Sequence, residues 1–554
     1  MTSLLENAKL AFQQQRWEVA EESLLSILEN NPGHPEASRL LAQMAFQAGY
    51  PDDSRDLLHS ALAAHPRDTA IKALLAKVEA QLGQVALQSN QCARAIELFL
   101  SALKLEGQEN HLLLGLLATA WLRNGFPAEA RRVYQRRLKH LPDDALAQAQ
   151  WVGLISGSPS HNAEALLAQC RHWDKRFGQP AAPLSKASQQ PRRENTKPRI
   201  GFLSTTLHHH ANCNFLLPLL KQLNPSRFEL FVFHDGKRED AVTERIKSTV
   251  SQFVRLSGQP VPDAAQTIAN YGIDVLIDIN GYFDDNRLQI LSYRPAPVQA
   301  HYLGGAGPTG LSCVDWWLVD DLAEPPGEPS FATEKIYRLE GGMHAFKPLS
   351  PAADPNPPPL RKNGFITFGC FNSLTKFEEP VLHFQADILR AFPESRLLLI
   401  KDIFKDESSA QRFRDRAQQA GIPDDRLDLK PPGPDCEFDN LSVYHHIDIA
   451  LDTFPYNGIT TTCEALWMGV PLITLRGNRF VAREAGALVT RAGFPEWIAA
   501  NSSEAIQIIG RVTAHLDNLE SLRFGLRDRF QRSPIGDPVR LARAFEAFLD
   551  QATA

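Results

Sequence analysis

The chain has 554 residues, 43% of them hydrophobic and 22% charged, which is enough for two to four domains with substantial cores. Its formal charge of −6 argues against the broad basic surface of a nucleic-acid-binding protein. The start lacks the charged-then-apolar pattern of a signal peptide, and no apolar run approaches the roughly 18 residues of a membrane helix. The seven cysteines are scattered and form no Cys-x-x-Cys pair, so we expect a cytoplasmic protein with reduced thiols.

The first third of the chain repeats with a period of 34 residues, which separates Pro32 from Pro66. Small and large residues recur at matching places: Ala8, Ala42, Gly83 and Ala118; Ala20, Ser54, Ala95 and Ala130; and Leu24, Leu58, Phe99 and Tyr134. Small residues let paired helices approach, and a proline ends the second helix. The pattern resembles the tetratricopeptide repeat and predicts a helical array over 1–177 that contacts a protein partner; the alternative is a generic helical bundle.

A segment rich in Pro, Ser, Gln and charge predicts a linker over 178–198, and short apolar strands then alternate with helices. The first series gives strands at 199–205, 228–235 and 274–280, with helices at 215–223, 240–250 and 263–272. The second gives strands at 365–372, 396–402 and 426–431, with helices at 378–391 and 407–420. This alternation predicts two parallel-sheet, Rossmann-like lobes, 199–350 and 351–554, with ligands at the carboxyl ends of the strands.

Residues 449–475, IALDTFPYNGITTTCEALWMGVPLITL, are the most informative stretch. An apolar strand ends at Asp452, a turn carries Asn457 and Gly458, and Thr460 to Thr462 begin a helix that leads to a second strand. The start of a helix has unpaired N–H groups and the positive end of its dipole, so it favours an anion such as a nucleotide diphosphate. A simpler interpretation is that threonine caps the helix.

Several motifs that would indicate other chemistry do not occur in the sequence. These are the P-loop, the Gly-x-Ser-x-Gly elbow, His-Glu-x-x-His and a metal-binding Asp-x-Asp. A cationic side chain must therefore neutralise any bound diphosphate.

Four segments in order after the repeats resemble one known family: RIGFLSTTLHHHANCNFLLPLL at 199–220, the stretch 272–310 with RPAPVQ, ITFGCFNSLTK at 366–376, and residues 449–475. The family is that of the bacterial O-linked N-acetylglucosamine transferases, or SPINDLY-like group. The resemblance covers nearly the whole chain and implies a two-lobed GT-B glycosyltransferase. It further implies UDP-N-acetylglucosamine as donor, inversion at the sugar carbon, no metal or other cofactor, and Ser or Thr of a protein as acceptor.

The resemblance also implies roles for residues. Lys376 matches the lysine on the diphosphate, Thr460 to Thr462 match the phosphate-binding threonines, and Glu464 matches an acid on the ribose. His210 matches the histidine proposed as general base, although relay through the diphosphate or water is the alternative. The other expected donor-binding residues are Asn372, Ser373, Asn457, Gly458, Gln299, Tyr282 and Gly307.

The sequence departs from the family pattern at several of these places. Ile459 stands where a relative has His, Ala211 replaces a proline after the histidines, and Ser373 replaces a residue that is often Gln or Asn. The loop at 304–310 is also altered, so GDP-fucose, or UDP-glucose with asparagine as acceptor, stays possible as a substrate. A non-catalytic repeat scaffold is the rival from another class, and a His208–His210 metal site is a further alternative. Neither nucleic acid nor membrane insertion is expected.

Overall fold

The computed structural model describes residues 2–179, 184, 196–283, 285–305, 307–328, 330–433 and 436–554, and the chain forms two compact units. One unit comprises Met1–Leu141 and Asp402–Asp415, and the other comprises Pro142–Lys401 and Arg416–Ala554. Most of the linker predicted over 178–198 lies outside the described residues.

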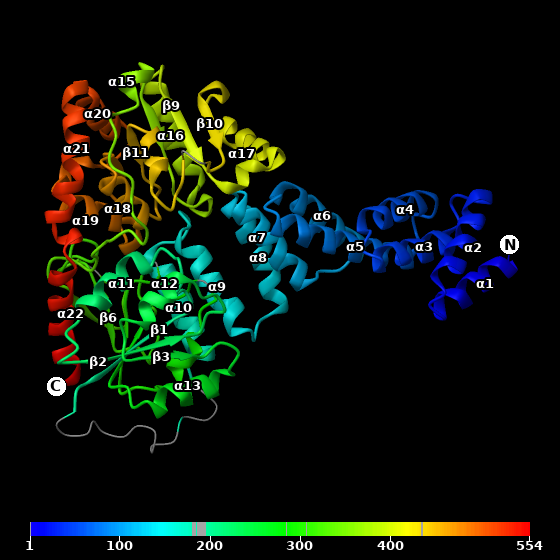
Figure 1. Cartoon of the computed structure of the whole chain (residues 1–554), viewed down its shortest axis with the longest axis horizontal. Coiled ribbons are helices and arrows are strands. Elements are labelled where there is room, and N and C mark those ends of the chain that lie inside the picture. The colour runs from blue at the N-terminus through cyan, green and yellow to red at the C-terminus, as the bar shows by residue number, and fades with distance from the viewer. Residues whose placement is uncertain are drawn as a thin grey trace. The chain divides into compact units, whose positions relative to one another are not determined.

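The first unit is an array of antiparallel helix pairs (Figure 1). Its helices are α1 Thr2–Gln13, α2 Trp17–Asn30, α3 Pro35–Gln47, α4 Pro51–Ala64, α5 Thr69–Gln88, α6 Cys92–Glu106, α7 His111–Arg123 and α8 Pro127–His140. The small residues of the repeat are buried where the two helices of a pair meet: a Cβ on Gly83 would come within 2.6 Å of the Phe99 ring. The predicted repeat architecture is therefore confirmed. Its third unit is longer because α5 has 20 residues.

This unit also includes the segment Asp402–Asp415, which carries most of helix α17 (Glu407–Gln419). The Ser409 hydroxyl accepts a hydrogen bond from the Ala93 N–H at 3.0 Å, and Arg412 pairs with Glu97 at 3.0 Å. An element of the second α/β series thus packs on α6 of the array.

The second unit begins with α9 (Ala145–Ser156) and α10 (Ala163–Phe177), followed by the first lobe. The lobe contains β1 Arg199–Ser204, α11 Cys213–Gln222, β2 Glu229–His234, α12 Ala241–Lys247, β3 Gln252–Arg255, α13 Val261–Asn270, β4 Val275–Asp278, α14 Gln289–Ser292, β5 Val298–His301, β6 Trp316–Val319 and β7 Lys335–Arg338. All seven strands are parallel, in the order β3-β2-β1-β4-β5-β6-β7. The strand order reverses between β1 and β4, which opens a crevice at their carboxyl ends.

The second lobe repeats this plan with six parallel strands in the order β10-β9-β8-β11-β12-β13. It contains α15 Leu360–Asn363, β8 Thr367–Gly369, α16 Glu379–Ala391, β9 Arg396–Ile400, β10 Leu427–Lys430, β11 Ile449–Leu451, α18 Thr460–Trp467, β12 Leu472–Leu475, α19 Glu484–Arg491, β13 Ile498–Ala499, α20 Ser502–Thr513 and α21 Leu516–Arg532. Here the order reverses between β8 and β11, so we expect ligands where these two strands end.

Helix α22 (Pro538–Thr553) follows the second lobe in sequence but packs on the first, against α11 and β4 (Figure 1). Its Phe545 ring stacks on Phe202 of β1 with centroids 6.2 Å apart and meets Tyr302 edge-on at 5.2 Å. All three side chains are fully buried, so α22 completes the core of the first lobe.

The predicted fold class, a tetratricopeptide array followed by two Rossmann-like lobes, is confirmed. The predicted strands and helices differ from the observed ones mainly by a few residues at their ends. Among the described helices, none combines the length and apolar character needed to span a membrane. The seven cysteines are all free, and six of them are buried.

Candidate functional site

The buried carboxylate of Asp452 organises the point where β8 and β11 end. It accepts hydrogen bonds from the Gly458 N–H at 2.8 Å, from the Asn372 amide at 3.2 Å and from the Thr474 hydroxyl at 2.8 Å. Burial raises the pKa of Asp452 to about 6, because the charged form loses its hydration. This one side chain therefore ties the loop after β8 to the turn that precedes α18.

Lys376 ends a short 3₁₀ turn (Leu374–Lys376) just after β8. Its Nζ donates to the Asn457 carbonyl at 2.7 Å and lies 4.0 Å from the centre of the Tyr456 ring. Burial lowers the pKa of Lys376 to about 8, while the charges of Asp452 and Glu484 act in the opposite direction. The ammonium is thus held by a carbonyl and an aromatic face beside the turn that leads to α18.

The first turn of α18 keeps its N–H groups available. Its N-cap residue, Ile459, gives no side-chain cap, and no backbone acceptor for the N–H groups of Thr460 to Thr462 occurs in the described parts of the chain. The threonine hydroxyls do not cap the helix either: Thr461 donates to Asn372 Oδ1 at 2.9 Å and Thr462 donates to the Gly458 carbonyl. The geometry suits an anion more than a self-capped helix.

Glu464 lies one turn further along α18. Its Oε2 accepts a hydrogen bond from the Tyr444 hydroxyl at 3.0 Å, and burial raises the pKa of Glu464 to about 7. The nearby Lys401 ammonium, which donates to the Phe371 carbonyl at 2.7 Å, opposes that rise. With a pKa of about 7, the Glu464 carboxyl is about half protonated at neutral pH, so it can accept from or donate to a hydroxyl group beside the start of α18.

The first lobe contributes the loop after β1. Asn280, which follows β4, fixes the start of this loop by accepting from the Thr205 N–H at 2.8 Å and donating to the Thr205 hydroxyl at 2.9 Å. His210 then lines a hollow of about 180 Å³ together with Thr460 and Glu464 of the second lobe. The structure thus brings these three predicted residues to one cleft between the lobes. Within the described residues, no three His, Cys, Asp or Glu side chains form a metal-binding group, so the histidine triplet is not arranged as one.

Three predicted residues, Tyr282, Gly307 and Gln299, lie elsewhere, whereas Ser373 caps the turn that carries Lys376. Tyr282 is buried and donates to the Thr309 carbonyl at 2.8 Å, and it lines a separate cavity together with Gly307. Gln299 is completely buried in β5, where its amide donates to the carbonyls of Leu291 and Cys313 at 2.9 and 2.7 Å, so it does not reach the cleft. Ser373 is exposed and accepts from the Thr375 hydroxyl at 2.9 Å.

Sequence reasoning did not single out several residues of this site. Asp452 and Tyr456 both lie in the segment 449–475. The acid at the end of a strand and the aromatic residue in the turn were the sequence features that could have indicated them. Glu484, at the start of α19, is 2% exposed, and both of its carboxyl oxygens are buried without a hydrogen-bond partner among the described residues. Burial raises its pKa well above the usual range, and nothing local in the sequence indicates that burial.

The family model described as glycosyl transferase family 41 matches residues 181–341 and 360–542, which cover both lobes. The chain belongs to glycosyltransferase family 41. Tetratricopeptide-repeat models match residues 11–78 and 80–145, in the helical array.

Two plant proteins are similar over much of this chain. Each is described as a probable UDP-N-acetylglucosamine–peptide N-acetylglucosaminyltransferase SPINDLY. The Oryza sativa protein is 30% identical over 420 residues, and the Arabidopsis thaliana protein is 33% identical over 352. These alignments cover 75% and 63% of this chain, but only 45% and 38% of the relatives, so the chain spans less than half their length.

A solved bacterial structure matches almost the entire chain. It is a lysine-to-methionine mutant of the O-GlcNAc transferase of Thermobaculum terrenum, 26% identical, with a TM-score of 0.74. The match covers 94% of this chain and 97% of that one. The GT-B arrangement of the two lobes agrees with this likeness.

Substituting Gly458 by alanine should weaken donor binding roughly 10- to 100-fold. The added methyl group overpacks the turn, and the free-energy cost of overpacking is typically about 1–3 kcal/mol. A Cβ at this position would overlap both Thr461 Oγ1 and Asn372 Oδ1, whose hydrogen bond joins the start of α18 to the loop after β8. Calorimetric titration with UDP measures the loss. Gly510→Ala, where a Cβ meets no neighbour within 4 Å, is the matched control and should bind UDP normally. Equal affinity of the two variants would contradict the assigned geometry.

The pH dependence of kcat/KM should show an alkaline limb near pH 8. Lys376 has a pKa of about 8 and carries positive charge only when protonated, so a rate that depends on its ammonium falls about tenfold per pH unit above that value. Burial also lowers the pKa of Lys401 to about 8, so the two lysines must be distinguished. Lys376→Arg should remove the limb because arginine keeps its charge, whereas Lys401→Arg should retain it. The opposite pattern would assign the limb to Lys401.

Proposed function

We propose that this family 41 protein transfers N-acetylglucosamine from UDP-N-acetylglucosamine to a serine or threonine hydroxyl of a polypeptide. The observation that carries the proposal is the pairing of a half-buried cation, Lys376, with the uncapped start of α18 at the strand-order reversal of the second lobe. The names of the plant and bacterial relatives support this donor and this kind of acceptor.

The proposed reaction is a single displacement with inversion. The acceptor oxygen forms a bond to the anomeric carbon, the bond from that carbon to the diphosphate oxygen breaks, and UDP leaves with both electrons. Lys376 and the N–H groups of Thr460 to Thr462 stabilise the charge that develops on the leaving diphosphate. Since these groups supply positive charge, we propose a reaction that needs no metal.

The remaining cleft residues position the reactants. Glu464 accepts the ribose hydroxyls, and the turn at Asn457 and Gly458 holds Lys376 against the diphosphate. His210 faces the same hollow from the first lobe and takes the proton of the acceptor hydroxyl. The helical array guides the acceptor polypeptide. Most of the acceleration then comes from positioning and from stabilisation of the leaving group.

The test offers the protein UDP-N-acetylglucosamine, UDP-glucose and GDP-fucose, each with and without a pool of serine- and threonine-containing peptides. Nucleotide release and the mass gained by the peptides are measured. We expect peptide-dependent UDP release and a gain of one N-acetylhexosamine. Transfer from GDP-fucose alone would replace the donor in this proposal, and binding of none of the three would refute the transferase function.

A further inference from the structure

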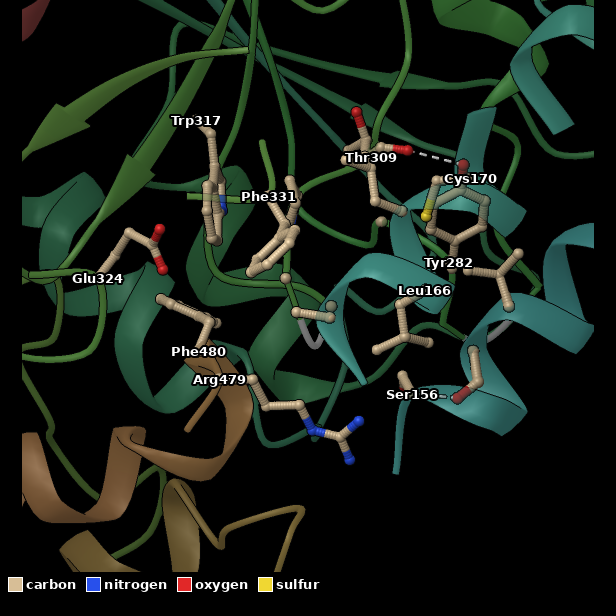
Figure 2. Close-up of a pocket in the computed structure, with 18 of the residues that line it drawn as sticks. Ser156, Leu166, Cys170, Tyr282, Thr309, Trp317, Glu324, Phe331, Arg479 and Phe480 are labelled. Atoms are coloured by element: carbon tan, nitrogen blue, oxygen red, sulfur yellow. Dashed lines mark hydrogen bonds between the residues drawn. The ribbon is translucent and has the colours of Figure 1, made fainter. Parts of the chain in front are cut away.

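A second cavity, of about 70 Å³, lies apart from the hollow that contains His210. That volume exceeds the roughly 10–15 Å³ that a single water requires. Three parts of the second unit enclose it: α9 and α10, the first-lobe loops near Tyr282 and Thr309, and residues 478–483. Figure 2 shows Leu166, Tyr282, Trp317, Phe331 and Phe480 among the side chains that surround it.

The cavity is separated from Lys376 by aromatic rings. Phe283 lines the cavity, and its ring centroid lies 5.8 Å from that of Tyr456. The Tyr456 ring also contacts the Lys376 ammonium, which lies 4.0 Å from the ring centre. A molecule that reacts beside Lys376 is therefore close enough to place another of its groups in the cavity.

The lining of the cavity favours an apolar group over a sugar. Most of its lining is apolar, including Trp317, Phe331, Phe480 and Leu166, and polar side chains such as Ser156, Thr309 and Asn478 make up the smaller part. Gly305 and Gly307 line it with backbone only, at φ +102° and +156°. Burial raises the pKa of Glu324 at its edge, which favours the neutral carboxyl there.

One polar atom in the wall lacks a partner. Arg479 is 7% exposed, and its terminal nitrogens donate to the carbonyls of Ser158 and His161 in the connection between α9 and α10. Its Nε is buried and has no hydrogen-bond partner in the described parts of the chain. Through its terminal nitrogens, Arg479 therefore ties residues 478–483 to the α9–α10 connection and fixes this side of the cavity.

We propose that this cavity is an acceptor subsite that takes an apolar side chain of the polypeptide near its modified hydroxyl. This subsite rests on the proposed transferase function and specifies its substrate class: serine or threonine with an apolar residue nearby. A pocket of this kind discriminates side chains that differ by a methylene by roughly 10- to 200-fold in kcat/KM.

The test changes the size of the cavity through Leu166, which is only half-buried. Leu166→Trp narrows the cavity and Leu166→Ala widens it. His172→Trp, on an exposed position of the same helix, is the matched control. A peptide series carries Ala, Val, Leu or Phe at each position around one serine, and kcat/KM is measured for each peptide.

We expect wild type and His172→Trp to favour an apolar residue at one position by at least about tenfold. Leu166→Trp should shift the preference to smaller side chains and Leu166→Ala to larger ones, with UDP affinity unchanged. The two variants should shift the preferred side-chain size in opposite directions. If one of them folds poorly, the other still tests the proposal.

An unchanged size preference in both variants, with transfer intact, would refute the subsite alone. Equal losses of UDP affinity and transfer would also refute it, because the cavity would then serve the donor. Absence of transfer in the wild type with every nucleotide sugar would instead refute the proposed function, and the subsite with it.

Discussion

Replacing Lys376 with methionine should lower kcat/KM for sugar transfer by about two to three orders of magnitude. Removal of one preorganised donor that faces developing oxyanion charge typically costs this much. The methionine side chain keeps much of the volume, so the Tyr456 ring retains a neighbour. The free energy of unfolding should fall by less than about 1 kcal/mol, because loss of a half-buried charge also removes its desolvation cost.

Single-turnover transfer and urea denaturation together check this expectation. The control is Lys362→Met, at an exposed position within α15. It should leave the transfer rate and the free energy of unfolding unchanged. UDP should still bind to Lys376→Met through α18, although more weakly. If Lys376→Met transferred the sugar at the wild-type rate, Lys376 would have no role in catalysis.

Replacing Asp452 with alanine should abolish detectable transfer and destabilise the fold by about 2–4 kcal/mol. The substitution leaves the Gly458 N–H, the Asn372 amide and the Thr474 hydroxyl without their shared acceptor. Asp452→Asn should be milder, because its oxygen still accepts from two of these donors. It also removes a negative charge that raises the pKa of Lys376, so the alkaline limb of kcat/KM should shift to lower pH.

Asp448→Asn is the matched control at the other end of β11. Asp448 is also buried and accepts from the N–H groups of Leu360 and Thr367, both at 2.8 Å. Its substitution should lower the urea midpoint without moving the alkaline limb. If Asp452→Asn leaves the limb in place, or if Asp452→Ala is as stable as wild type, Asp452 does not organise this site.

The second-lobe residues that the sequence indicated all follow strand ends, although they come from distant parts of the chain. Thr460 to Thr462 follow the turn after one strand and Lys376 follows another, so the position of each strand end placed them. The alternation of strands and helices also predicted both sheets, because buried parallel strands read as apolar runs.

The first lobe was harder to predict for a physical reason. Both faces of a central parallel strand are buried, so the sequence of β5 does not tell which face Gln299 occupies, and its amide bonds inside the lobe. Tyr282 follows a strand end as expected, but packs edge-on against Trp173 of α10, over 100 residues earlier. Such long-range partners have no local signal, and Glu484 was missed for the same reason.

The packing of α22 on the first lobe has a consequence during synthesis. The lobe's own strands end with β7 at Arg338, and α22 begins at Pro538, 200 residues later. At about 5–20 residues per second, the ribosome needs roughly 10–40 s to make that stretch. During this interval the apolar faces of Phe202 and Tyr302 lack Phe545, so the nascent first lobe presents a surface for chaperones until α22 emerges.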